Sequence, residues 1–232
     1  MKRTHKLWDS SSRRIVLRAV RGETVAFQLG IEGGKTGVTA VGVQTSVLVS
    51  PGGASLPVVQ FELIKIYDTE VSDRGSGPAN NPTVGKGWYP DALVPWAVGD
   101  ADAHGGYVGP PFAIKPGEVR GVWCDLTIPY GTAAGEYTGT LTAQSEGERT
   151  PLQVALRVPD LDIPRRIHNL FFMNFSTADL DRAGGHWLKG QKLSAYQDAV
   201  YRMSRRHRFT AGNVYGEDMQ RIEETSEAPP RP

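Results

Sequence analysis

The segment Trp88-Tyr89-Pro90-Asp91 places two aromatic side chains next to a carboxylate. Exposed Trp and Tyr rings can stack on a sugar ring, and a nearby carboxylate can accept hydrogen bonds from its hydroxyls. Aromatic residues with a polar group also fill the end of a β-sandwich or the seam between domains, and this packing role is our leading interpretation. Trp88, Tyr89 and Asp91 are therefore candidate glycan-binding residues with a structural alternative.

Glu217-Asp218 could suggest glycoside cleavage, which uses two carboxyl groups. The pair follows a predicted strand, and α/β barrels place their catalytic groups at the carboxyl ends of strands. It also leads into an acidic, proline-rich tail, where neighbouring carboxylates are normally solvated. We therefore assign no catalytic residue to this chain.

Neither the histidines nor the cysteine predicts a metal site. No two histidines have a ligand spacing such as H-x-x-x-H. They are His5, His104, His168, His186 and His207. Cys124 is the only cysteine, which excludes an intrachain disulfide and a cysteine-based metal site. Its place in an alternating segment predicts a buried, inert thiol. No nucleotide-binding loop is present, and we expect no cofactor.

The charge and hydropathy of the chain limit its partners. With 26 basic and 25 acidic side chains the net charge is +1, which gives no electrostatic reason to expect nucleic acid. No apolar run approaches the roughly 20 residues that cross a bilayer. The basic N-terminus lacks the apolar segment of a signal peptide. As written the chain would be cytoplasmic, and extracellular or periplasmic if its true N-terminus is missing.

The candidate residues must be positioned by strands. Apolar and polar residues alternate along three segments between Val122 and Val158, which predicts half-buried antiparallel strands. Earlier segments bring the total to about eight strands and predict an immunoglobulin-like antiparallel β-sandwich over residues 15–158. Residues 1–14 should form a loose polar segment. Residues 58–67 are apolar at both parities, so we expect a bulge or burial on both faces. Residues 72–116 should be a long, ordered, aromatic-rich loop.

A different pattern begins at Pro159. Asn169–Phe175 is an apolar run typical of a buried parallel strand, and Ser194–Arg208 predicts a helix with Met203 on its buried side. Phe209–Val214 could form a second strand. Residues 159–216 therefore predict a single β-α-β unit, and residues 217–232 a disordered tail. One such unit cannot bury its own strands, so it packs on the sandwich, binds another chain or begins a longer domain.

Four motifs occur in a fixed order along the chain. They are Gly22-Glu23-Thr24-Val25-Ala26-Phe27-Gln28-Leu29, Gly87-Trp88-Tyr89-Pro90-Asp91-Ala92-Leu93-Val94-Pro95, Trp123-Cys124-Asp125-Leu126-Thr127-Ile128-Pro129 and Gly135-Glu136-Tyr137-Thr138-Gly139-Thr140-Leu141. The series resembles the N-terminal region of family-123-type glycoside hydrolases, in which similar strands, loop and hairpin follow one another. The resemblance covers roughly Gly22 to Phe175, and Ala134 stands where those proteins usually have proline.

The resemblance implies a β-sandwich in front of a catalytic β/α barrel. It also implies hydrolysis of N-acetylgalactosaminides, with help from the acetamido group of the substrate and a neighbouring Asp-Glu pair in the barrel. Asn169–Tyr215 would then be only the first strand, helix and second strand of that barrel. Glu217-Asp218 has the reverse order, so we do not transfer the catalytic role to it.

Three functional hypotheses follow. The first is an accessory sandwich region of a truncated or split glycoside hydrolase, which is not catalytic alone and supports a barrel or contacts glycan. The second is a non-enzymatic structural or interaction protein that binds a partner, or itself, through its β-α-β surface. The third is a carbohydrate-binding module. The expected partners are a glycan, a chain that completes the barrel or a second copy, with neither nucleic acid nor a membrane span.

Overall fold

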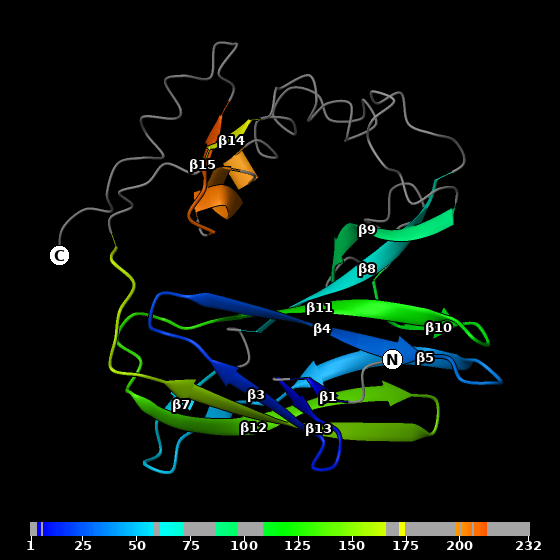
Figure 1. Cartoon of the computed structure of the whole chain (residues 1–232), viewed down its shortest axis with the longest axis horizontal. Coiled ribbons are helices and arrows are strands. Elements are labelled where there is room, and N and C mark those ends of the chain that lie inside the picture. The colour runs from blue at the N-terminus through cyan, green and yellow to red at the C-terminus, as the bar shows by residue number, and fades with distance from the viewer. Residues whose placement is uncertain are drawn as a thin grey trace. The chain divides into compact units, whose positions relative to one another are not determined.

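The computed structural model of the chain describes residues 4–5, 7–57, 61–71, 87–96, 109–165, 172–174, 198–199, 201–205 and 207–212. The chain divides into two compact units, Met1–Ile163 and Pro164–Pro232, and each is described by itself (Figure 1). Strands dominate the described residues, so the prediction of a mainly β protein is confirmed. No helix in these ranges is long and apolar enough to cross a membrane.

The larger sheet of the first unit has nine strands. Seven follow the order β1-β2-β3-β13-β12-β5-β10, while β6 pairs with β12 and β7 pairs with β6. Their bounds are β1 (Thr4–His5), β2 (Trp8–Asp9), β3 (Arg14–Arg18), β5 (Val38–Thr45), β6 (Leu48–Val49), β7 (Ser55–Leu56), β10 (Phe112–Ile114), β12 (Gly135–Ser145) and β13 (Glu148–Val158). The β3–β13 pair is parallel and the others are antiparallel.

The smaller sheet contains four antiparallel strands in the order β4-β11-β8-β9. They are β4 (Thr24–Glu32), β11 (Val119–Thr127), β8 (Phe61–Val71) and β9 (Gly87–Pro95). A register shift between Ile66 and Asp68 places two residues of β9 opposite one residue of β8, as in a β-bulge. This sheet carries both the aromatic candidate segment and the Trp123-Cys124-Asp125 segment, so it is the sheet that positions the candidate site.

One buried core is shared by the two sheets. The larger sheet contributes residues such as Leu17, Leu141 and Leu156, and the smaller contributes Cys124 and Leu126. Each of these side chains has at most 1% of its surface exposed. The alternation predicted between Val122 and Val158 is present in β11, β12 and β13, because apolar residues at every second position of a strand all point to one face.

Two parts of the first unit differ from the sequence prediction. Residues 4–5 and 8–9 form strands within the segment 1–14 that we expected to be loose. Strands β9 and β10 lie within residues 72–116, which we expected to form one loop. Prolines interrupt the strand pattern there, but β9 is an edge strand, where proline removes no hydrogen bond that a further strand needs.

The last segment of the first unit is attached beside Arg21. The Arg21 guanidinium donates hydrogen bonds to the carboxylates of Asp160, at 2.7 Å, and Asp162. Main-chain bonds add to these: Arg21 N–H donates to Leu161 O at 3.1 Å, and Ile163 N–H donates to Arg21 O at 2.9 Å. The carboxylates raise the pKa of Arg21 further above its usual value. The two aspartates of this segment thus bind one arginine.

The second unit contains two short parallel strands, β14 (Phe172–Asn174) and β15 (Thr210–Gly212). Residues 198–199 and 201–205, which lie between them in sequence, are helical. Tyr201 and Ser204 are buried, whereas Met203 is 41% exposed. The prediction that Met203 is buried is therefore wrong, and the buried side of the helix includes its neighbour Ser204 instead. Glu217-Asp218 and the predicted tail lie outside the described residues.

Candidate functional site

The predicted sugar-binding residues lie on β9, at the edge of the smaller sheet. The Trp88 side chain is 67% exposed. Tyr89 is only half-buried, and its ring lies beside Gly87, whose added Cβ would meet it at 3.6 Å. Asp91 belongs to the same strand, but its side chain lies outside the description.

Trp88 and Tyr89 do not form one aromatic platform. They are neighbours in a strand, and successive side chains of a strand point to opposite faces. Register places Trp88 opposite Glu70 and Tyr89 opposite Thr69 on β8. A sugar ring could therefore stack on Trp88 alone, and the segment offers less than the two stacked rings that its sequence suggests.

Trp88 shares its face with an apolar surface that we call the outer patch. Residues of β8 at even positions and residues of β11 at odd positions lie on this face, which is turned away from the shared core. The outer patch consists of Ile64, Ile66, Trp88, Leu93, Val119 and Trp123. Leu93 and Val119 are 52% and 51% exposed, whereas Ile66 is only 6% exposed. The smaller sheet thus carries apolar residues on both faces, as the mixed pattern of residues 58–67 predicted, although register also places Asp68 and Glu70 of β8 on the outer face.

A buried carboxylate lies at the base of the outer patch. Trp123 Nε1 donates a hydrogen bond of 2.6 Å to Asp125 Oδ1, two positions further along β11. Asp125 is only 7% exposed, and register places it opposite Ala26 on β4 and Glu62 on β8. Because a buried acceptor without a donor is costly, the indole N–H is what allows this aspartate to sit under the patch. The Trp-x-Asp motif is therefore a structural pair.

Gly121 allows the patch to pack closely. A Cβ added at Gly121 would lie 2.8 Å from Ile66 Cδ1 and 3.3 Å from Ile66 Cβ. Ile66 therefore lies against the backbone of β11 at this point, and it is only 6% exposed although it faces away from the core.

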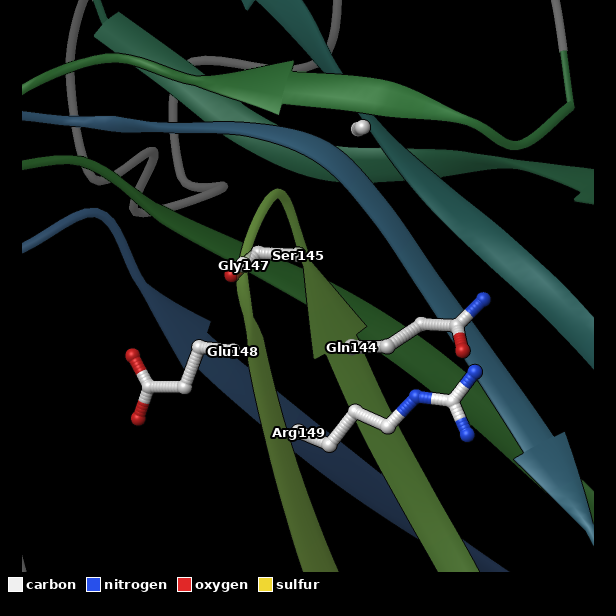
Figure 2. Close-up of a pocket in the computed structure, with 6 residues that line it drawn as sticks. Gln144, Ser145, Gly147, Glu148 and Arg149 are labelled. Atoms are coloured by element: carbon white, nitrogen blue, oxygen red, sulfur yellow. The ribbon is translucent and has the colours of Figure 1, made fainter.

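Two hollows lie at the turn between β12 and β13. The first has a volume of about 520 Å³ and is lined by Ala40, Gln144, Ser145, Gly147, Glu148 and Arg149. The second, of about 460 Å³, shares Ser145 and Glu148 with it. Figure 2 shows the Gln144 and Arg149 side chains side by side, with Glu148 directed to the other side of the hairpin. An amide and a guanidinium placed together can donate hydrogen bonds to an anionic or hydroxyl-rich ligand.

The thiol and the acidic residues give no further site. Cys124 is fully buried, and burial, then the nearby Asp125 charge, raises the pKa of its thiol to about 12. The prediction that Cys124 is buried is thus confirmed. Its raised pKa agrees with the predicted low reactivity, because the thiolate is the reactive form. Within the described ranges, no three His, Cys, Asp or Glu side chains are grouped so that they could hold a metal ion.

Residues 1–145 match the glycoside hydrolase 123 N-terminal domain. The chain belongs to this family. The match includes β9, the outer patch and all of β12 but not β13, so the outer patch belongs to a glycoside hydrolase 123 N-terminal domain.

One solved structure agrees with the assignment at the level of fold. A family 123 glycoside hydrolase from Clostridium perfringens, studied for glycolipid glycan hydrolysis, is similar with a TM-score of 0.64 and 13% identity. The alignment covers 83% of this chain and 32% of that one, so the chain spans about a third of the enzyme's length. AvmM, which catalyses macrocyclization in alchivemycin A biosynthesis, has a TM-score of 0.36, 12% identity and coverages of 64% and 86%. The CooA pilin subunit of enterotoxigenic Escherichia coli has a TM-score of 0.29, 10% identity and coverages of 66% and 91%. No curated protein matches.

Sequence reasoning found Trp88 but did not find the outer patch or the hollows of this N-terminal domain. Leu93 and Val119 are isolated apolar residues in the sequence, and only the strand register brings them to the same face as Trp123. Gln144 and Arg149 are opposite each other because the hairpin turn between them has two residues, Glu146 and Gly147. The pair matches no catalytic motif, so the sequence did not mark it.

Proposed function

We propose that the chain is the accessory β-sandwich region of a glycoside hydrolase-like protein and does not catalyse hydrolysis by itself. The observation that carries this proposal is the match to an N-terminal domain, combined with coverage of only 32% of a family 123 enzyme. The two sheets around one core support an immunoglobulin-like sandwich. The parallel β14–β15 pair supports a β-α-β unit that begins a β/α barrel.

The role of this region is to support a catalytic barrel, supplied by a longer chain or by a second chain. Monomeric domains rarely leave large apolar patches in contact with water, and such patches commonly mark an interface. The outer patch, with Trp88, Leu93 and Val119 exposed, is the surface that we assign to this role. The hydrogen bond from Trp123, a member of the patch, to the buried Asp125 fixes the orientation of its indole ring.

The DNA downstream of the Pro232 codon tests whether the chain comes from a truncated or split gene. An adjoining reading frame that encodes further alternating strands and helices, with a neighbouring Asp-Glu pair, is the expected result. Unrelated sequence on that side would contradict the split-gene form of the proposal, and an interaction protein would then be the better explanation.

Self-association through an exposed surface is the second candidate function, and the same outer patch favours it. Light scattering would then show a dimer whose population rises with concentration and falls in the Leu93→Ser/Val119→Ser variant. A chain that stays monomeric at all concentrations would rule out self-association, and a catalytic barrel would then be the proposed partner of the outer patch.

Glycan contact through Trp88 is the third candidate, supported by the 67% exposure of its ring. A carbohydrate-binding role predicts that Trp88→Ala abolishes binding on a glycan array, with Asp91→Ala weakening it. Tyr89 lies on the other face of β9, so Tyr89→Phe should leave binding unchanged. Equal binding by Trp88→Ala and the parent chain would dismiss this role.

A further inference from the structure

The outer surface of the larger sheet carries four arginines on two neighbouring strands. Register places Arg14 opposite Gln153 and Arg18 opposite Arg157 on the β3–β13 pair. Ile15 and Leu17 alternate with the arginines of β3 and are buried, so Arg14 and Arg18 face away from the core. Arg149 and Arg157 lie on the same surface, because the residues of β13 that face the core have even numbers. We call Arg14, Arg18, Arg149 and Arg157 the basic face.

The positive charge of the basic face is only partly balanced by two acidic neighbours, Asp9, which register places opposite Arg14, and Glu136, opposite Arg157. Arg157 Nε lies 3.6 Å from Glu136 Oε1, and both side chains are more than half exposed, so this ion pair is weak. In the described part of the chain, Arg14, Arg18 and Arg149 form no ion pair. A protein with a net charge of only +1 thus concentrates exposed arginines on one surface, and clustered charge of one sign attracts a polyanion.

The neighbours of the arginines favour a glycan over a nucleic acid. Thr138, Thr140 and Thr142 lie on the same surface of β12, opposite Ala155, Gln153 and Pro151 of β13. The Gln153 amide lies between the arginines of β13, and the threonine hydroxyls flank them on the neighbouring strand, so the face can hydrogen-bond a ligand that carries hydroxyls as well as charges. Single-stranded nucleic acids are normally bound with aromatic side chains that stack on the bases. The strand positions of β3, β12 and β13 on this surface include no aromatic residue.

One end of the basic face is hollowed. Gln144 lies opposite Arg149 on the β12–β13 hairpin, and both line the hollow of about 520 Å³. Figure 2 shows their polar ends close together and turned to the same side. Ala40, whose φ is 51°, lines the same hollow where β5 departs from regular alternation. This end can hold one anionic group while the rest of the face contacts the continuing chain.

We infer that the basic face binds a linear polysaccharide that carries carboxylate or sulfate groups, with the Gln144–Arg149 hollow as its anchor. Arg149 and Arg157 are eight positions apart on β13, a span of about 27 Å at the usual rise of an extended strand. A small anion can contact only one of these arginines, whereas an extended polymer can contact all four. The site lies on a different sheet from the outer patch, so it does not depend on the proposed support of a barrel.

The inference is tested by fluorescence anisotropy with labelled heparin fragments and labelled polygalacturonate, at 50 mM and 500 mM NaCl. We expect saturable binding of at least one polymer at low salt, and weaker binding at high salt because salt screens exposed charges. The Arg14→Gln/Arg149→Gln variant should bind at least tenfold more weakly. The Lys35→Gln/Arg202→Gln variant removes two exposed positive charges elsewhere and should bind like the parent chain.

Three results would contradict the inference. Absence of binding to both polymers would overturn it, and equal weakening in the two variants would show attraction by net charge rather than by this face. Binding of duplex DNA as tightly as the polysaccharides would overturn the choice of a glycan. Far-UV circular dichroism of both variants verifies the fold, and Gln144→Ala tests the hollow without changing the charge.

Discussion

One hydrogen bond, from Trp123 to Asp125, contributes to the structure of the outer patch. Trp123 and Asp125 both belong to the family-like motif, and the structure joins them by a 2.6 Å hydrogen bond on the face of the outer patch. The sequence predicted that both residues face away from Cys124, since they alternate with it. It could not predict that the aspartate is buried, because burial depends on neighbouring strands that are distant in sequence.

Removal of the Trp123 indole should destabilise the fold. In Trp123→Phe, Asp125 keeps its buried carboxylate and loses its donor, which should cost about 1–3 kcal/mol of unfolding free energy. Urea denaturation measures the loss. In an Asp125→Ala background the same substitution should cost at least about 1 kcal/mol less, since the pair would already be broken. Additive effects of the two substitutions would show that the bond contributes nothing.

Cys124 should make stability depend on alkaline pH. Burial holds its folded-state pKa near 12, above the ordinary value of 9.0, so the protonated thiol favours the folded state. The contribution is complete below pH 9 and is lost as the pH rises toward 12, at roughly 1.4 kcal/mol per pH unit. The difference in unfolding free energy between the parent chain and Cys124→Ala isolates the effect from other titrating groups. A difference that is constant between pH 8 and 11 would contradict this assignment.

At the scale of elements, a strand could be predicted from the sequence where its apolar and polar residues alternate regularly. Strands β11, β12 and β13 were predicted because one face of each is buried and the other is polar, which gives strict alternation. Strand β9 was not predicted, because an edge strand can contain prolines and this one also has a bulge. The outer patch was missed for a related reason: it is formed by register between strands rather than by any one segment.

Gly139 should be intolerant of substitution where β12 passes β6. An added Cβ would lie 2.5 Å from Leu48 Cδ2 and 2.8 Å from Val47 O. Gly139→Ala should therefore lower the unfolding free energy by about 1–3 kcal/mol, the usual cost of overpacking a core. Gly30→Ala is the matched control, since its Cβ would make an ordinary 3.6 Å contact with Val119. Thermal unfolding compares the two, and equal melting temperatures would refute the close approach.

Arg21 should control the order of the segment that leaves the first unit. Arg21→Ala removes the contacts to Asp160 and Asp162 but keeps the main-chain bonds to Leu161 and Ile163. We expect several-fold faster hydrogen exchange of the Ile163 amide, because local opening becomes easier. Core amides such as that of Leu141 should keep their exchange rates. Arg18→Ala serves as the control, and an unchanged Ile163 rate in Arg21→Ala would show that the side chain does not hold this segment.

At the scale of the whole molecule, the chain has two surfaces with different chemistry on two different sheets. The outer patch of the smaller sheet is apolar, and the basic face of the larger sheet is cationic. The family and the mainly β fold could be predicted from four motifs and their order, and the family match confirms the first of these. The surfaces could not be predicted in this way, because they are formed by residues of several strands that only the register brings together.

A turnover measurement on the isolated chain decides whether it is an enzyme by itself. The substrate is a chromogenic aryl N-acetyl-β-galactosaminide, and a family 123 enzyme that includes its barrel is the positive control. We predict that the chain releases chromophore no faster than buffer, at any protein concentration. Release that is proportional to the concentration of the chain, and that persists through a second purification, would contradict the assignment of an accessory, non-catalytic region.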